Sequence, residues 1–303
     1  MKKTIFLLLL LFSFLFPSTG RAIVYVNETW DIGTPHADWP CKKAPTGPCD
    51  SNLSFRGWIP PVADYCNQAS MAYWAETGVS TDKAHSGAKS FKMNRNYTSS
   101  DNGTCDIQYP LPTPYPTKIY IRFYLYLTSE WVTFNTPATR EPYFHFLFTN
   151  SALSGTGFRV NLLARVPWTS PHICGYGQGG TTPYMFFNCQ NYNNECTVDA
   201  PAGCYNLLDH LEEWQAVEFM MDAANKKYSI WINGTNYVNN VTVPMSQSNF
   251  TMIQFSQFAS DCGGTGFNTT YYVDDIIIGT DYIGPEAGAD TTPPPAPTGV
   301  AVS

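Results

Sequence analysis

Residues 119–127 alternate between two kinds of side chain, and this alternation constrains the fold more than any other feature of the chain. One set is apolar: Ile119, Ile121, Phe123, Leu125 and Leu127. The other set carries hydroxyl or guanidinium groups: Tyr120, Arg122, Tyr124 and Tyr126. A period of two residues is that of a β-strand that buries one face. The segment therefore predicts a strand with an apolar core side and a polar outer side.

Similar patterns recur along the chain. They occupy residues 143–148, 158–165, 184–189, 214–222, 228–233, 252–258 and 271–278. Proline and glycine residues separate the runs, and Asn233-Gly234 is typical of a tight hairpin turn. Only residues 207–214 suggest a short helical turn. Many short strands without helical periods predict an all-β, antiparallel sandwich or barrel.

The first 22 residues have the pattern of a secretory signal peptide. Lys2 and Lys3 precede an apolar run at residues 5–16, and Gly20-Arg21-Ala22 supplies small residues for cleavage. The apolar run is too short to span a bilayer. We therefore expect residues 1–22 to be removed, and the mature protein to be secreted or displayed at the cell surface, without membrane insertion.

Nine cysteines agree with an oxidising compartment. Cys41 with Cys49, and Cys196 with Cys204, are close pairs that could each close a small loop, and Cys66 with Cys105 is a possible longer link. Cys174, Cys189 and Cys262 leave one thiol over. Sequence alone does not fix the connectivity. The cysteine spacings lack the C-x₂-C pattern of zinc sites, so structural disulfides are expected.

Composition excludes several classes of partner. The chain carries a net charge of −7, which argues against nucleic acid and against anionic membranes. An aromatic content of 15% argues against disorder. There is no Gly-x-Ser-x-Gly elbow and no phosphate-binding loop.

Six segments in order resemble the concanavalin A-like lectin/glucanase jelly-roll superfamily, including its polysaccharide-lyase members. They are residues 27–31, 85–91, 118–124, 214–218, 228–234 and 271–279. The resemblance spans roughly residues 24–285 and implies an antiparallel jelly-roll β-sandwich over residues 23–285. Residues 286–303 form a Pro-rich linker that ends in what resembles the start of a fibronectin type III module. Further C-terminal modules are therefore expected.

The resemblance implies a concave sheet that holds a glycan, and we place the polar sides of several strands there. The expected binding residues are Tyr120, Arg122, Tyr124, Tyr126, Tyr143, Arg159, Asn161, Glu218 and Gln254. Tyrosine rings stack on sugars, and arginine forms two-pronged contacts with carboxylate or sulfate. The predicted function is binding of an extracellular, acidic polysaccharide. The alternative placement is on the other sheet, where the same residues would be ordinary surface groups.

Two alternatives stay open for the function. A polysaccharide lyase on the same scaffold would cleave a uronic-acid polymer by β-elimination, with His145, Tyr184 and Arg122 as its catalytic residues. The alginate-lyase motifs of the superfamily are absent, and so is the paired-carboxylate signature of its glycosidases. The other alternative is a structural ectodomain of a larger surface protein.

The resemblance also implies a structural calcium ion between the entry strand and the closing strand. Glu28 and Asp275 are the expected ligands, because calcium prefers carboxylate and carbonyl oxygens. Asp274 and Asp275 are adjacent in a predicted strand, so their side chains should face opposite ways. Asp274 is therefore expected at the surface or in support of a turn. The alternative is that Asp275 bonds backbone amides of a neighbouring loop.

Overall fold

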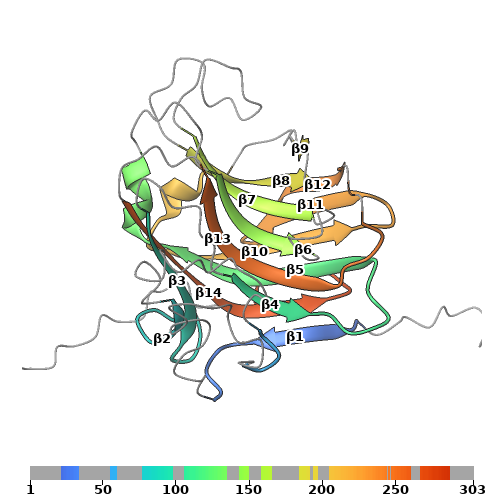
Figure 1. Cartoon of the computed structure of the whole chain (residues 1–303), viewed down its shortest axis with the longest axis horizontal. Helices are drawn as coiled ribbons and strands as arrows, with labels where there is room; N and C mark the ends of the chain where they lie inside the picture. The colour runs from blue at the N-terminus through green and yellow to red at the C-terminus, as the bar shows by residue number, and fades with distance from the viewer. Residues whose placement is uncertain are drawn as a thin grey trace, which may run out of the picture.

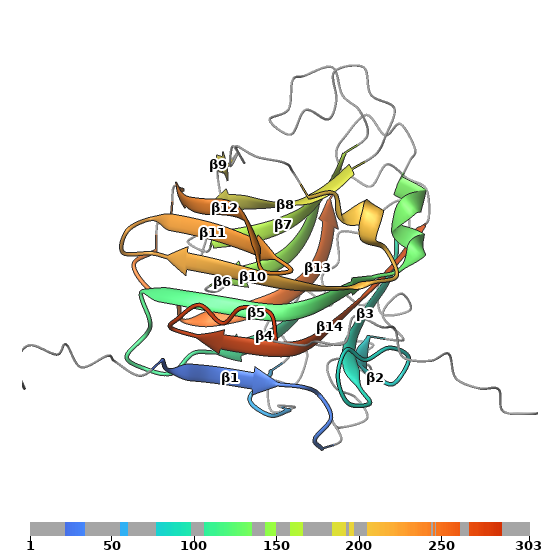
Figure 2. The same ribbon diagram turned by 180° about the vertical axis from the view of Figure 1, so that it is seen from behind.

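The computed structural model describes residues 22–33, 55–59, 77–97, 106–134, 143–149, 158–165, 184–191, 194–196, 205–243, 245, 247–260 and 267–286. These residues form β-strands and two short 3₁₀ helices, η2 (Ser129–Phe134) and η4 (Leu207–His210). The strands lie in two layers that face each other (Figures 1 and 2).

The first layer is an eight-stranded antiparallel sheet. Its order is β12 (Thr235–Thr242), β11 (Lys227–Ile232), β10 (Trp214–Asp222), β5 (Lys118–Leu127), β14 (Phe267–Gly279), β3 (Ser90–Tyr97) and β2 (Gly78–Ser80). The eighth strand, β1 (Val24–Glu28), pairs with the second half of β14. The long β14 strand therefore joins the first strand of the domain to the centre of the sheet, as Figure 2 shows.

The second layer is a six-stranded antiparallel sheet. Its order is β4 (Asp106–Pro110), β13 (Met252–Ser260), β6 (Tyr143–Thr149), β7 (Phe158–Arg165), β8 (Tyr184–Asn191) and β9 (Asn194–Cys196). The isolated pair Ile59 and Gln108 adds residues 55–59 beside β4. Figure 1 views this sheet from the side that faces away from the first layer.

The hydrophobic core lies between the two sheets. Phe123 of β5 meets Phe255 of β13 edge to face, with ring centroids 5.4 Å apart. Trp58 packs on the same Phe255 ring at 5.9 Å and is fully buried. All five apolar residues of the alternating 119–127 segment belong to this core. The strand predicted first from the sequence is thus central to the sandwich, and its polar side faces outward.

The predicted fold class is confirmed: the described residues form an antiparallel jelly-roll β-sandwich, and their only helices are the two short 3₁₀ helices. The predicted helical turn at 207–214 is the single 3₁₀ turn η4. The predicted signal peptide, apart from Ala22, and the predicted 286–303 linker, apart from Glu286, lie outside the described residues. Among the residues that the structure describes, no helix is long and apolar enough to cross a membrane.

Candidate functional site

The structure divides the predicted binding residues between two sheets. Five of them lie on the outward side of the eight-stranded sheet: Tyr120, Arg122, Tyr124, Tyr126 and Glu218. The others lie on the six-stranded sheet: Tyr143, His145, Arg159, Asn161, Tyr184 and Gln254. The expectation that all of them line a single concave face was wrong. Side chains alternate with a period of two residues in the strands of both sheets, so alternation does not show which sheet a strand joins.

On the six-stranded sheet, strand register gathers polar residues into one row. Gln108 of β4 is the Cα partner of Gln254, Gln254 of Phe148, and Phe148 of Arg159. Arg159 is in turn the partner of Gln190, and Gln190 of Glu195. Residues on either side of Gln254, Ile253 and Phe255, belong to the core. Since cross-strand partners share a face of the sheet, these positions form one row, called the polar row below, on the side opposite to Ile253 and Phe255. Gln254 itself is only 2% exposed.

A second row runs beside the polar row on the same face. His145 of β6 is the Cα partner of Asn161 of β7, and Asn161 is the partner of Asn188 of β8. Further along β7, Leu163 pairs with Tyr143 and Arg165 with Tyr184. Alternation along β7 puts Arg159, Asn161, Leu163 and Arg165 on one side. By register, the six predicted positions of this sheet therefore lie on one side of it, opposite to Ile253 and Phe255.

Sequence reasoning missed four polar members of this face: Gln108, Asn188, Gln190 and Glu195. Gln108 donates from Nε2 to Gln254 Oε1 at 3.2 Å, which links the first two members of the polar row directly. Asn188 and Gln190 flank Cys189 at a spacing of two residues, which was the available signal. The sequence did not show which face of the sheet Asn188 and Gln190 occupy, because that depends on the register of β8 against β7, which the local pattern does not reveal.

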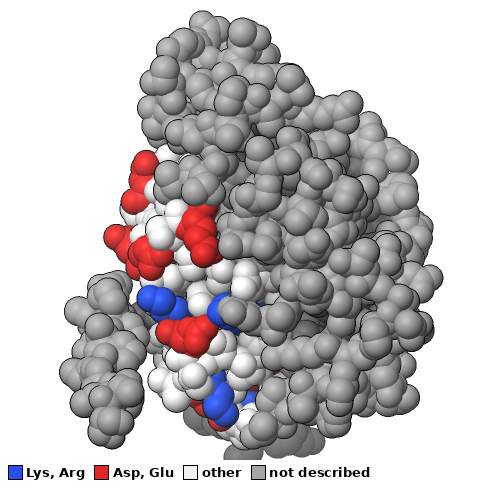
Figure 3. All heavy atoms as spheres, turned by 60° about the vertical axis from the view of Figure 1, so that its left-hand side comes forward, with Lys and Arg blue, Asp and Glu red and all other residues white. Residues whose placement is uncertain are grey.

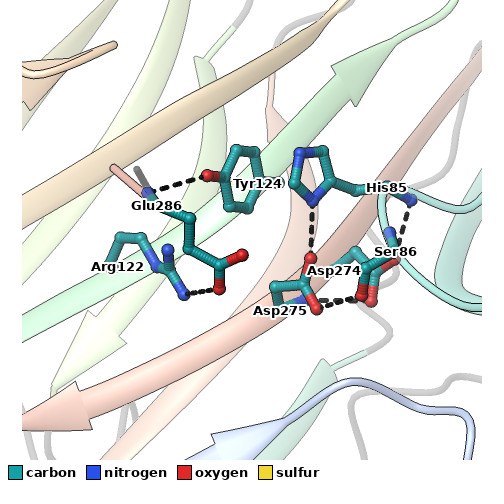
Figure 4. A network of polar contacts seen from close by, with 7 residues as sticks. All are labelled: His85, Ser86, Arg122, Tyr124, Asp274, Asp275 and Glu286. Atoms are coloured by element: carbon teal, nitrogen blue, oxygen red, sulfur yellow. Dashed lines mark hydrogen bonds and ion pairs between the residues drawn. The ribbon is translucent and has the colours of Figure 1, made fainter. Parts of the chain in front are cut away.

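The outward side of the eight-stranded sheet is covered by a loop, residues 81–89, as Figure 4 shows for its centre. His85 Nδ1 lies 2.5 Å from Asp275 Oδ2, and the side chains are 7% and 5% exposed. Ser86 Oγ donates to Asp275 Oδ1 at 2.6 Å. The His85 ring stacks on Tyr124 with centroids 3.4 Å apart. We call these contacts, together with those of Asp274, the clasp.

Asp274 joins the clasp through backbone amides. Its Oδ2 accepts from His85 N at 2.8 Å, and its Oδ1 accepts from Asp275 N at 2.9 Å. The side chain is fully buried. Burial and the neighbouring Asp275 carboxylate raise the pKa of Asp274 to about 8, although the amide donors oppose the rise.

The expectation that Asp274 and Asp275 face opposite ways was wrong. The pairing of β14 with β5 shifts register between Asp274 and Ile277, and Asp275 has a φ of 47°. An irregularity of this kind interrupts the alternation of side chains. Both carboxylates therefore contact the same loop, and Asp274 supports that loop from a buried position.

A second segment, residues 282–286, crosses the same outward face; we call it the strap. Glu218 accepts from the backbone amides of Ile283 and Gly284, each at 2.8 Å. Arg122 Nη2 donates to Glu286 Oε1 at 3.0 Å (Figure 4). The backbone amide of Glu286 donates to Tyr124 Oη at 3.2 Å. Burial raises the pKa of Glu218.

The loop and the strap bury most of the predicted residues on this side. Arg122 is 1% exposed, Glu218 3% and Tyr124 3%, while Tyr126 is also buried and Tyr120 is half-buried. The expectation that these side chains form an open glycan groove is therefore wrong. Their roles here are to hold the loop and the strap against the sheet.

The two predicted calcium ligands both have protein partners. Glu28 Oε1 accepts from Arg56 Nη1 at 2.6 Å and from Trp30 N at 2.8 Å, and burial raises its pKa. Asp275 is engaged by His85 and Ser86 in the clasp. Within the described ranges, no group of three His, Cys, Asp or Glu side chains could hold a metal ion. Calcium binding remains a prediction from the resemblance. The protein contacts of Glu28 and Asp275 do not favour these two carboxylates as its ligands.

Exposed charges near the loop are mixed in sign (Figure 3). Lys92 Nζ lies 2.8 Å from Asp82 Oδ2, and Lys83 Nζ lies 3.9 Å from Glu212 Oε2. Lys83 also lies over the Tyr126 ring. The face shown there offers an acidic ligand no extended basic surface among the described residues. Arg159 and Arg165 of the six-stranded sheet are therefore the arginines that we consider below for binding an acidic ligand.

Most of the cysteines predicted to form disulfides lie outside the described residues: Cys41, Cys49, Cys66, Cys105 and Cys204. Cys196 ends β9, and its Cα partner is Cys189 of β8.

Comparison with known proteins supplies only distant similarities. No protein-family model and no curated protein matches the sequence. A GH131 β-glucanase catalytic domain from Podospora anserina is 14% identical over 86% of this chain and 98% of its own, with a TM-score of 0.47. "Cellulose induced protein, Cip1" is 14% identical over 83% of this chain and 99% of its own, with a TM-score of 0.44. An endo-β-1,4-glucuronan lyase from the fungus Trichoderma reesei is 13% identical over 68% and 88%, with a TM-score of 0.38. At these values the similarities carry no inference about activity.

Proposed function

We propose that this protein is an exported, carbohydrate-binding β-sandwich that recognises an acidic extracellular polysaccharide on the outward face of the six-stranded sheet. The observation that carries the proposal is the polar row, in which Gln108, Gln254, Phe148, Arg159, Gln190 and Glu195 follow one another across the sheet and all but Phe148 are polar. The row is perpendicular to the strands, and neighbouring strands lie about 4.8 Å apart. A row of this kind places polar residue types at the spacing of the strands, along the direction that an extended polymer would follow; Gln254, at 2% exposed, contributes through its contact with Gln108.

The chemistry of the face supports a sugar acid. Carboxamides donate and accept hydrogen bonds with hydroxyl groups, and tyrosines at positions 143 and 184 supply rings that can stack on sugars. Arg159 and Arg165 supply guanidinium groups for carboxylate or sulfate. The covered face of the eight-stranded sheet, in contrast, has its arginine buried beneath the strap.

A polysaccharide lyase is the second candidate, and one observation favours it. Register aligns His145 with Asn161 and Asn188, on the face that also holds Tyr184 and Arg159. In β-elimination a cation or amide neutralises the substrate carboxylate, a base removes the adjacent proton and an acid protonates the leaving oxygen. Arg122 is withdrawn from the predicted catalytic set, because it lies on the other sheet.

The proposal is tested with immobilised alginate, glucuronan, heparin and a neutral glucan, each measured for binding and for release of unsaturated uronate by ultraviolet absorbance. We expect saturable binding to at least one acidic polymer, weakened by salt, and no binding to the neutral glucan. Accumulation of unsaturated product would replace binding alone by the lyase function. Absence of binding and product with every acidic polymer would overturn both candidates.

A further inference from the structure

The end of the polar row is formed by a short hairpin at the edge of the six-stranded sheet. Its strands are β8 (Tyr184–Asn191) and β9 (Asn194–Cys196). The register pairs Asn191 with Asn194, Gln190 with Glu195 and Cys189 with Cys196. Of the nine cysteines, only these two lie in described strands, and they are direct Cα partners.

The backbone spacing of such partners suits a disulfide. Directly opposite residues of an antiparallel pair have Cα atoms about 4.5 or 5.5 Å apart, according to whether they exchange backbone hydrogen bonds. A disulfide tolerates Cα separations of about 4.4–6.8 Å. Both kinds of pair therefore lie within reach of a disulfide.

Position on the sheet gives the pair a second property. Cys189 is the Cα partner of Val160, Val160 of Leu147, and Leu147 of Phe255. Phe255 is a buried core residue, so the register places Cys189 and Cys196 on the core face, opposite to the polar row.

We propose that Cys189 and Cys196 form a disulfide that fastens the three-residue edge strand β9 to β8. Oxidation removes two protons and two electrons from the two thiols. The acceptor is the disulfide of an exported thiol–disulfide oxidoreductase, which leaves as a dithiol after a mixed-disulfide step. This pairing differs from the link between Cys196 and Cys204, which their proximity in the sequence suggested. The disulfide would make the hairpin of β8 and the edge strand β9 more rigid. It would thereby hold Gln190 and Glu195 at the end of the polar row.

Peptide mapping of the protein purified from an oxidising compartment tests the pairing. Free thiols are alkylated in denaturant without reduction, and the chain is then cut with chymotrypsin and Asp-N. Cleavage after Phe187, Tyr192 and Tyr205 and before Asp199 separates residues 188–192, 193–198 and 199–205, so each carries one of Cys189, Cys196 and Cys204. We expect the first two peptides joined and lighter by two hydrogens, and separated by reductant. A link between the second and third peptides, or alkylated Cys189 and Cys196, would overturn the proposal.

Thiol titration in denaturant supplies a measurement that does not require a native fold. Relative to wild type, Cys189→Ser should expose one additional thiol, that of Cys196. The double variant Cys189→Ser/Cys196→Ser is the matched control and should give the wild-type count. A count one lower in the single variant, or two higher in the double variant, contradicts the pairing. These readouts are independent of glycan binding, so they stand or fall separately from the proposed function.

Discussion

The Nδ1 atom of His85 lies 2.5 Å from Oδ2 of Asp275, and more than nine-tenths of both side chains is buried. His85 comes from the covering loop and Asp275 from the long central strand β14, 190 positions later. The contact ties that loop to the outward side of the eight-stranded sheet. From this contact we predict that the carboxylates of the clasp, Asp274 and Asp275, contribute more to stability than exposed carboxylates do.

Asp275→Asn should destabilise the protein strongly. Asparagine keeps one acceptor oxygen, so the contact with His85 Nδ1 or the one with Ser86 Oγ is lost inside the buried clasp, and a buried polar group without its partner costs about 1–3 kcal/mol of unfolding free energy. The matched control is Asp82→Asn, since Asp82 pairs with Lys92 at the surface and is 54% exposed. An exposed pair of this kind contributes about 0–1 kcal/mol. Urea unfolding at one pH measures both changes, and equal values for the two variants would contradict a structural role for the clasp.

The stability of the protein should fall as pH rises from about 4 to 8. The pKa of Asp274 is about 8 in the folded chain and 3.8 in the unfolded reference, so the folded state binds the extra proton between these values. Stability decreases with pH wherever the folded state binds more protons, by at most about 1.4 kcal/mol per pH unit for one group. Asp274→Asn should flatten this dependence, leaving the smaller slope from Glu28 and Glu218, whose pKa values are also raised. Parallel profiles for variant and wild type would remove Asp274 as the cause.

Glu218→Gln should loosen the strap. Glu218 accepts from two backbone amides through its two oxygens, and glutamine retains only one acceptor oxygen. A buried amide without an acceptor costs about 1–3 kcal/mol. Hydrogen exchange at Ile283 and Gly284 should accelerate, whereas Glu213→Gln, at a residue 61% exposed, should leave it unchanged. Unaltered protection in Glu218→Gln would show that other contacts hold the strap.

Arg159→Ala should weaken binding of the acidic polymer by about ten- to a hundredfold, which corresponds to about 1.5–3 kcal/mol for a charge-assisted hydrogen bond. Lys83→Ala is the control, because it removes the same charge from the covered face of the other sheet. Its binding constant should match that of the wild type. Equal weakening by both substitutions would indicate a general electrostatic effect and would contradict a site on the six-stranded sheet.

The strands and the fold class could be predicted from the sequence because alternation is a local property. Assignment of strands to sheets could not, since 119–127 and 158–165 show the same period but lie in different layers. The outward side of β5 was recognised correctly from its alternation, yet its burial depends on residues 81–89 and 282–286, which are remote from it in sequence. The irregularity at Asp275 was also invisible, because nothing in the local pattern marks a positive φ there.

The candidate site was predicted in part for the same reason. Residue type identified Arg159, Asn161 and His145, but only the register of β7 with its neighbours shows that they share a face with Gln190. The alignment of Cys189 with Cys196 likewise follows from the two-residue connection between β8 and β9. Proximity along the chain suggested another partner for Cys196.

The pairing of β1 with β14 sets how the domain would respond to pulling. Ile23 donates to Thr280 Oγ1, and Thr280 N donates to the carbonyl oxygen of Ile23, so the residues that flank β1 and β14 meet at one point. Because the strands are antiparallel, a load applied at Ile23 and Thr280 would open their ladder from that point, one hydrogen-bonded pair after another, instead of shearing all pairs together. β1 would therefore detach at low force, while the sheet beyond it, held through β5 and β10, would remain intact.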